Sequence, residues 1–266
     1  PVGLGLNSLI LFWAYIISPT QAKFFAVLGA LILAVFLLVR YVTYPTPLAH
    51  GRPMNLLNVL QIKPKLHRAL VLFSFILFVY TFSNWMKAFV STVSWDVHGG
   101  WDARLVWNLK ARFYFRALEN WKGMFSPALE WAHPDYPLML PGAVAWGWNW
   151  CGKEALIWPA VVQLAFFLSL VLLVVWHHTS LGKLWVGLLA GSFLFTVPSY
   201  LLWPAGLFAD PPLSFFILGA AILLLHSLRT RNAAAFWISS WLAAMAAWTK
   251  NEGLLFLLWF TLLAAP

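Results

Sequence analysis

Apolar runs long enough to enter a lipid bilayer recur along the whole sequence, and they constrain the fold more than any other feature. The hydrocarbon core of a bilayer is about 30 Å thick, so a helix needs roughly 20 apolar residues to cross it. Eight segments approach this length: Val2–Ser18, Phe24–Tyr41, Ala69–Ser91, Ala155–Trp176, Leu184–Trp203, Leu213–Leu228, Ala233–Trp248 and Gly253–Pro266. Because backbone polar groups in hydrocarbon must be satisfied within the protein, these segments predict an all-α, polytopic transmembrane helical bundle.

The composition excludes a soluble globular domain. Hydrophobic residues make up 62% of the chain and charged residues only 9%, whereas a soluble domain carries roughly a quarter charged residues. The net charge of +9 comes from basic residues beside the apolar runs, so it reports membrane topology rather than binding of nucleic acid. The single cysteine, Cys151, excludes an internal disulfide framework.

A ninth apolar stretch, Pro137–Trp150, is too short to cross the membrane. Its 14 residues are also interrupted by Pro141, Gly142 and Gly147. At ~1.5 Å per residue, a helix of this length does not reach across the hydrocarbon core. We therefore expect an interfacial or re-entrant helix here.

This choice places all the acids on one side of the membrane. With the N-terminus in the cytoplasm, the inner loops Arg40–Arg68, His177–Lys183 and Arg229–Asn232 contain basic residues and no acid. Lys and Arg alone split eight inside to nine outside and do not decide the orientation, but six of the outer ones lie in one long loop, Thr92–Glu154, which is less constrained. The outer side then holds all eight acids: Asp96, Asp102, Glu119, Glu130, Asp135, Glu154, Asp210 and Glu252.

The predicted spans divide the chain into two parts. Residues 1–68 form a two-helix N-terminal lead with a basic cytoplasmic linker, and residues 69–266 form the main bundle, whose large outer loop carries interfacial helices. The chain begins at Pro1 rather than Met, and its last apolar run stops at Pro266. We therefore expect a fragment, cut at both ends.

Two acids open the large outer loop. Asp96 and Asp102 each follow a tryptophan and flank a His-Gly-Gly turn, and Asp102 falls at the start of a predicted helix, Ala103–Asn120. Acids near a membrane are candidates for function, and either carboxylate could act as a general base. We favour Asp102 as the base, because the helix N-terminus would keep its carboxylate ionised. The alternative is that Asp102 only caps this helix.

Polar side chains recur every four residues along that predicted helix. Such spacing places side chains on one ridge, and a row of cations near the membrane can hold a phosphate or pyrophosphate. A helix lying on anionic headgroups would show the same pattern. The ridge consists of Arg104, Asn108, Arg112 and Arg116.

Three further polar clusters lie on the outer side. The first is the proline-rich corner His133-Pro134-Asp135-Tyr136-Pro137-Leu138, in which Asp135 could contact substrate or cap the next helix. In the second, Asp210 precedes two prolines and is either a helix cap or a functional acid. In the third, Lys250 and Glu252 interrupt two apolar helices, either as a structural pair or as a headgroup site. Topology alone brings these clusters to one face.

The ordered motifs resemble those of the GT-C glycosyltransferases. The resemblance is to bacterial membrane enzymes similar to the protein O-mannosyltransferases, the lipid A aminoarabinose transferase and the Rgt-type sugar transferases. It covers residues 69–266. It departs from the family pattern because each of the two outer loops has one acid where the family often has a pair, and Ala103 occupies the place of the second acid in the first loop. The motifs that carry it are Trp101-Asp102-Ala103-Arg104, His133-Pro134-Asp135-Tyr136-Pro137-Leu138, Ala209-Asp210-Pro211-Pro212-Leu213 and Thr249-Lys250.

The resemblance implies a GT-C fold, a function and a location. The donor would be a sugar on a polyprenyl phosphate, and the acceptor a hydroxyl (or amine) on a lipid, glycan or protein. The transfer would be inverting and would occur outside the cytoplasm, at the bacterial inner membrane. It implies no certain cofactor and leaves a divalent cation open.

These expectations assign a role to each candidate residue. Asp102 is the base and Asp96 its competitor, and Asp210 orients the acceptor or a metal. Arg112, Arg116 and Lys250 hold the donor phosphate. Substrate contacts are assigned to His133, Asp135, Tyr136 and Glu252.

Two other classes of protein fit the same sequence. A secondary transporter would place charges at the bilayer midplane and use broken helices and repeated halves. A non-catalytic membrane assembly protein would not need acids gathered on one face. The sequence contains no Gly-rich phosphate loop, no zinc-binding spacing and no Gly-x-Ser-x-Gly motif.

Overall fold

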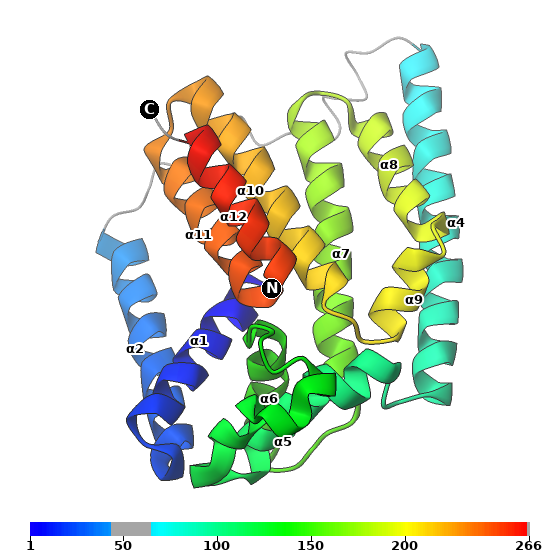
Figure 1. Cartoon of the computed structure of the whole chain (residues 1–266). Helices are drawn as coiled ribbons and strands as arrows, with labels where there is room; N and C mark the ends of the chain where they lie inside the picture. Colours follow the sequence, from blue (N-terminus) through cyan, green and yellow to red (C-terminus); the bar gives the residue numbers. More distant parts are fainter. Residues whose placement is uncertain (44–64, 265–266) are drawn as a thin grey trace.

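A computed structural model describes residues 1–43 and 65–264, and the described residues form helices and no strand (Figure 1). The basic linker expected before residue 68 falls largely on residues 44–64, outside the described part. The helices are α1 (Val2–Ile17), α2 (Ala22–Thr43), α4 (Lys65–Trp95), α5 (Asn108–Arg116), α6 (Met139–Cys151), α7 (Ile157–Ser180), α8 (Leu184–Thr196), α9 (Ser199–Ala205), α10 (Asp210–Thr230), α11 (Ala233–Thr249) and α12 (Asn251–Ala264).

The helices form a bundle with a second layer beneath it. In Figure 1, α4, α7, α8, α10, α11 and α12 occupy the upper part, and α5 and α6 lie below them. The lower layer also contains two 3₁₀ segments, η3 (Leu118–Phe125) and η4 (Pro127–Ala132). The large outer loop predicted from the sequence therefore folds into a helical layer under one end of the bundle.

Several helices could span a membrane. By length and apolar composition α4, α7 and α10 qualify, and the bent pair α8–α9 counts as a fourth span if it is taken as one. Four further apolar helices are shorter in the described part of the chain: Val2–Ile17, Pro19–Val35, Ala233–Thr249 and Asn251–Ala264. The described residues of each of the eight predicted apolar segments are thus helical, with a break in Leu184–Trp203, and three segments, or four with the bent pair, meet the length and composition of a membrane span over their described residues.

The segment Leu184–Trp203, predicted as one span, is not one continuous helix. The chain bends by 67° between α8 and α9. Val197 is extended, with φ −73° and ψ 119°, and Pro198 follows it. Proline lacks an N–H and disfavours helical geometry in the residue before it, so the helix ends here.

The predicted helix Ala103–Asn120 is also corrected. A π-helical turn, Ala103–Trp107, leads into α5, and the chain leaves α5 through Leu118 into η3. Leu118 has a φ of +44°, a left-handed conformation that a β-carbon disfavours and that does not continue an α-helix. Arg104 and Arg116 therefore do not lie on one straight ridge.

The bundle is asymmetric in how much of each helix it covers. In an apolar 18-residue stretch of α4 only 22% of the residues are buried, against 56% in the corresponding stretch of α10. Leu72, Phe73 and Ile76 of α4 are exposed, whereas Trp85 and Phe89 pack inward. Exposed aliphatic and aromatic residues at this density indicate a lipid-facing surface.

Helix α6 lies within the protein interior. Its residues Met139–Trp148 are all buried, and it packs against α1, α5 and α7. The helix predicted over Pro137–Trp150 is present as α6, while its interfacial or re-entrant placement stays a prediction. Two glycines permit the close approach, because a β-carbon at Gly142 would lie 2.7 Å from Ser8 Cβ and one at Gly147 would lie 1.9 Å from Trp158 Nε1.

Helix α1 belongs to the same core as the main bundle. Leu11, Ala14 and Tyr15 cluster with buried residues of α5, α6, α10 and α11. The indole Nε1 of Trp248 also donates a hydrogen bond of 3.0 Å to Ser8 Oγ, which joins α11 to α1. The first helix of the predicted N-terminal lead is therefore part of the packed body.

We expect Gly147→Ala to lower stability, since the new methyl group would displace Trp158 and break its 3.1 Å hydrogen bond to the Ala143 carbonyl. Overpacking of this kind costs about 1–3 kcal/mol. Thermal unfolding in detergent measures the effect. Gly3→Ala is the matched control, because a β-carbon there meets nothing within 4 Å and alanine favours the helix. Equal melting temperatures for the two variants would contradict the packing described.

Candidate functional site

Charged residues from two separate helix junctions meet where the bundle joins the lower layer. Lys250, between α11 and α12, lies 3.3 Å from Asp210 Oδ1 at the start of α10. It also lies 3.2 Å from Glu252 Oε1 in the first turn of α12. Burial lowers the pKa of Lys250 and the two carboxylates raise it, with a net upward shift. The ammonium is therefore held in its charged form.

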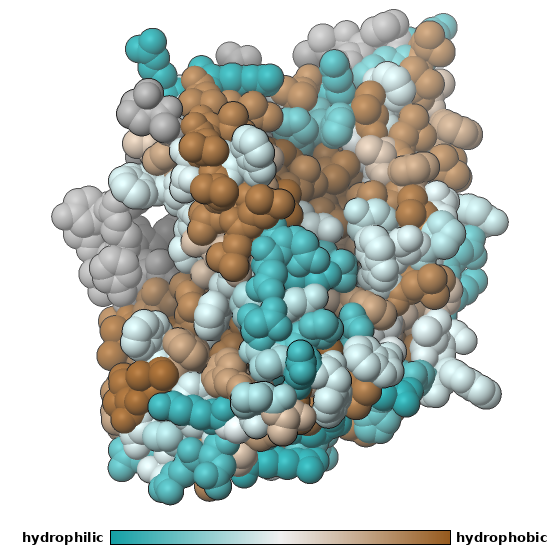
Figure 2. All heavy atoms as spheres, viewed as in Figure 1, coloured by the Kyte–Doolittle hydropathy of each residue, from teal (hydrophilic) through white to brown (hydrophobic). Residues whose placement is uncertain are grey.

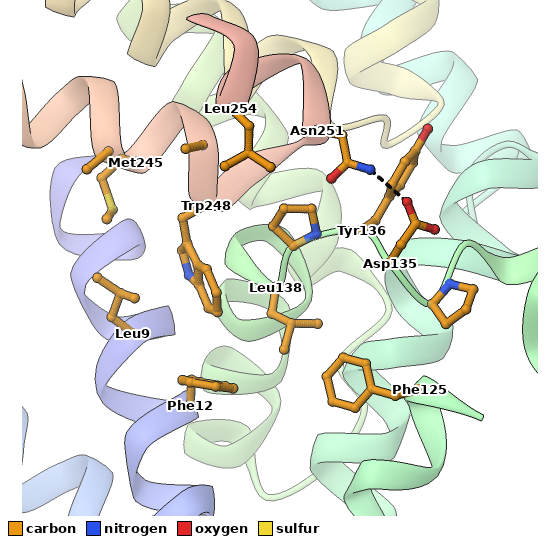
Figure 3. A pocket seen from close by; sticks show the side chains of 14 residues that line it. Leu9, Phe12, Phe125, Asp135, Tyr136, Leu138, Met245, Trp248, Asn251 and Leu254 are labelled. Atoms are coloured by element: carbon orange, nitrogen blue, oxygen red, sulfur yellow. Dashed lines mark hydrogen bonds between the residues drawn. The ribbon is translucent and has the colours of Figure 1, made fainter. Parts of the chain in front are cut away.

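The proline-rich corner joins this charged group directly. Asn251, next to Lys250, donates a 2.7 Å hydrogen bond from Nδ2 to Asp135 Oδ2 (Figure 3). Burial raises the pKa of the neighbouring Tyr136 hydroxyl. Nearby charges also act on this hydroxyl: Lys250 lowers its pKa, and Glu252, Asp135 and Asp102 raise it. Tyr136 thus lies within the electrostatic reach of all four of these predicted site residues.

The two acids at the start of the outer loop have different surroundings. Asp96 Oδ2 pairs with Arg104 Nη2 at 2.5 Å, and Arg104 Nε donates to the Gly99 carbonyl at 2.8 Å. The carboxylate of Asp102 accepts no hydrogen bond from the residues that the structure describes. Asp96 is therefore compensated by its own cation, and Asp102 is available.

None of three acids caps a helix in the way the sequence allowed. The expectation that backbone N–H groups hold Asp102 is wrong, because the residue is already helical and makes no capping hydrogen bond. Helix α6 is preceded by Leu138 and not by Asp135. Helix α10 starts at Asp210 itself, after Ala209, again without a side-chain cap.

Lys110 holds the corner in place, and the sequence analysis missed it. It is only 1% exposed, and its Nζ donates to the carbonyls of His133 at 2.6 Å and Tyr136 at 3.0 Å. Burial lowers the pKa of Lys110 to about 8, although Asp135 raises it. Its position in the sequence could have indicated this burial. Lys110 is three residues after Trp107 and four before Tyr114, which places it on the apolar side of the helix.

An aromatic stack supports the same corner. The ring of Tyr136 lies between those of Trp107 and His133, with centroid separations of 5.4 Å and 4.8 Å and nearly parallel planes. His133 adopts a left-handed conformation with φ +49°. Offset parallel rings are favourable, so the stack fixes the direction in which Tyr136 and Asp135 leave the corner.

Arg112 and Arg116 have a different partner from the acids that pair with Lys250. Both arginines pair with Glu154: Arg112 Nε lies 3.3 Å from Oε2, and Arg116 Nη2 lies 2.8 Å from the same atom. The guanidinium of Arg112 also lies over the ring of Trp148, 6.0 Å from its centroid. Burial raises the pKa of Glu154, but the two arginines lower it further, so the net shift of this pKa is downward. The predicted phosphate-binding set is thus divided between two places.

A cavity of about 630 Å³ opens beside the corner. Its apolar wall is formed by α1, α11 and α12, and its polar edge by Asp135, Tyr136 and Asn251 (Figure 3). Figure 2 shows hydrophobic residues over the upper part of this face and hydrophilic ones gathered at its centre. The wall residues include Leu9, Phe12, Met245, Trp248 and Leu254.

The arrangement offers an apolar space, a cation and several carboxylates, but no ready metal site. Within the part of the chain that the structure describes, no three His, Cys, Asp or Glu residues lie close enough together to hold a metal ion. Comparison of the chain with protein-family models, curated proteins and solved structures gave no match. The chemistry of the site therefore rests on its geometry.

We expect Lys110→Met to destabilise the protein and loosen the corner, because the His133 and Tyr136 carbonyls lose their charged donor. Hydrogen bonds to charged groups contribute about 1.5–3 kcal/mol, which corresponds to a fall in melting temperature of roughly 3–10 °C. Thermal unfolding and limited proteolysis at the corner measure this. Lys153→Met, at an exposed lysine, is the control and should leave both unchanged. A Lys110→Met variant as stable as the control would show that the clamp is dispensable.

Proposed function

We propose that the chain is a GT-C-type membrane glycosyltransferase that moves a sugar from a polyprenyl-phosphate donor to a hydroxyl (or amine) acceptor outside the cytoplasm. The observation that supports it best is the cavity of about 630 Å³, whose polar edge adjoins the Lys250 cluster. A ligand with an apolar tail and a phosphate would match both the apolar wall of the cavity and its polar edge. The carboxylates beside it supply the proton acceptor that a transfer requires.

The reaction is a single displacement at the anomeric carbon of the donor sugar. The acceptor oxygen forms a bond to this carbon while the bond from the carbon to the phosphate oxygen breaks. The acceptor's proton passes to a carboxylate, and the electron pair of the broken bond leaves with the polyprenyl phosphate. Attack from the side opposite the phosphate inverts the configuration. The residues must therefore stabilise an anion on one side and accept a proton on the other.

Lys250 is the residue best suited to the departing phosphate. Its side chain is only 16% exposed and lies between Asp210 and Glu252, which keep it charged. A charged donor in a poorly solvated place binds a phosphate oxygen more strongly than it would in water. Arg112 and Arg116 are weaker candidates, because they pair with Glu154 and none of these three residues lines the cavity.

Asp102 is the proposed base. Its carboxylate acts electrostatically on Tyr136 and has no hydrogen-bonding partner among the described residues, whereas Asp96 is paired with Arg104. A base must be free to accept a proton from the acceptor. Asp210, Asp135 and Glu252 then serve to orient the acceptor and Lys250.

One observation favours a secondary transporter as the second candidate. The α8–α9 break at Val197 and Pro198 is a discontinuous helix of the kind that transporters use. The cavity beside it is lined by neutral side chains, among them Tyr80, Thr81 and Asn84. Solute uptake by proteoliposomes containing this chain would favour this function over the transferase.

We expect Asp102→Asn to abolish transfer while leaving folding and donor binding intact. Loss of a general base costs about 10²–10⁴-fold in rate, and asparagine preserves the size of the side chain. Transfer of a radiolabelled sugar from polyprenyl phosphate to membrane extract measures the rate. Asp96→Asn is the matched control, because this acid is compensated by Arg104. A near-wild-type rate for Asp102→Asn with an inactive Asp96→Asn would assign the base to Asp96.

We expect Lys250→Met to weaken donor binding by about tenfold or more, as loss of a charge-assisted hydrogen bond to phosphate does. Arg112→Met should have a smaller effect, since neither Arg112 nor its partner Glu154 lines the cavity, whereas Lys250 is next to Asn251, which does. Equilibrium binding of the radiolabelled donor distinguishes the two. Stronger loss in Arg112→Met than in Lys250→Met would place the phosphate at the arginines instead.

A further inference from the structure

Tyr136 lies at the boundary between the large apolar cavity and the charged cluster around Lys250. The residue lines the cavity of about 630 Å³. Its hydroxyl interacts electrostatically with Lys250, Glu252 and Asp102. In Figure 3 the hydroxyl lies at the end of the side chain away from Trp248 and the rest of the apolar wall. One residue therefore borders the apolar space and reaches the charges beside it.

The side chain of Tyr136 is held in one direction by its neighbours. Its ring stacks between those of Trp107 and His133. Its carbonyl accepts a 3.0 Å hydrogen bond from the buried Lys110, whose ammonium also lies 5.9 Å from the centroid of the ring. Because the ring and the backbone are both fixed, the hydroxyl keeps its place without a hydrogen bond of its own.

The hydroxyl of Tyr136 is a free donor. It forms no hydrogen bond with any described residue, and it is open to solvent, unlike the closed-off hydroxyl of Tyr114. Burial raises the pKa of the Tyr136 hydroxyl, Lys250 lowers it and three carboxylates raise it, with a net upward shift. A phenol ordinarily ionises near pH 10, so at neutral pH this group is an O–H that lacks an acceptor.

A phosphate oxygen beside Lys250 is the acceptor that the surroundings favour. The ammonium already shares its charge with Asp210 and Glu252, so a phosphate there needs a further donor. A hydrogen bond to a charged oxygen is roughly twice as strong as one between neutral groups. A neutral hydroxyl that is fixed in advance supplies such a bond without ordering a flexible side chain.

We propose that the Tyr136 hydroxyl donates a hydrogen bond to a phosphate oxygen of the polyprenyl-phosphate donor, next to Lys250. This role rests on the proposed function, because it requires a lipid-borne phosphate at the polar edge of the cavity. The departing phosphate gains negative charge as its bond to the anomeric carbon breaks, and a donor already in place stabilises that charge. The proton stays on Tyr136 throughout.

The test removes one oxygen atom. Tyr136→Phe keeps the ring between Trp107 and His133 and breaks no hydrogen bond among the described residues. Native mass spectrometry of the full chain in detergent measures the affinity for undecaprenyl phosphate and for undecaprenol, the same lipid without phosphate. We expect a loss of about tenfold for the phosphate lipid, no change for the alcohol and an unchanged melting temperature. Tyr80→Phe is the matched control, at an exposed tyrosine of α4 that does not line this cavity.

Four outcomes would overturn the proposal. If the wild type binds undecaprenyl phosphate and Tyr136→Phe binds it equally well, the hydroxyl has no such role and the proposed transfer still stands. Equal losses for both lipids, or a lower melting temperature, would show that the hydroxyl supports the cavity and not the phosphate. An equal loss in Tyr80→Phe would show an effect unrelated to this site. No binding of undecaprenyl phosphate by the wild type would count against the proposed function and this role together.

Discussion

The buried ammonium of Lys110 is the interaction on which the position of the polar cluster depends. It ties α5 to the backbone of the corner through the carbonyls of His133 and Tyr136. From the corner, Asp135 reaches Asn251, and the adjacent Lys250 reaches Asp210. Desolvating a lysine is unfavourable unless its donors are satisfied. The two carbonyls meet that requirement, and in return the lysine fixes a segment that has little regular secondary structure.

The corner can approach the bundle because α6 is so closely packed. Gly142 and Gly147 allow Ser8 and Trp158 to come within contact of the α6 backbone. Trp248 then bonds to Ser8 and joins α11 to the same unit. The apolar wall of the large cavity is therefore formed by helices whose spacing is set by glycines, while its polar edge is set by Lys110. The two halves of the cavity have separate structural causes.

Much of the fold could be predicted from the sequence, because apolar length and charge placement are local properties. Most of the helices, the short α6 and the convergence of Asp210, Lys250 and the corner followed from them, whereas the predicted helices Leu184–Trp203 and Ala103–Asn120 are broken. What failed depended on tertiary contacts. Asp102 could be interpreted as a cap because caps are common before helices, but the chain had already turned into a helix at that residue. The partner of Arg112 and Arg116 is Glu154, 42 and 38 residues away, and no spacing rule indicates it.

The lengths of the helices set the depth of the polar cluster. Helix α10 begins at Asp210 and α12 at Asn251, so the N-terminal ends of both helices lie next to the lower layer (Figure 1). Charged residues at helix ends remain near water, whereas charges at the midplane of a bilayer are costly. The lower layer covers this end without filling it, which leaves the cavity beside Asp135 and Asn251. The cavity therefore has an apolar wall on α1, α11 and α12 and a polar edge at Asp135 and Asn251.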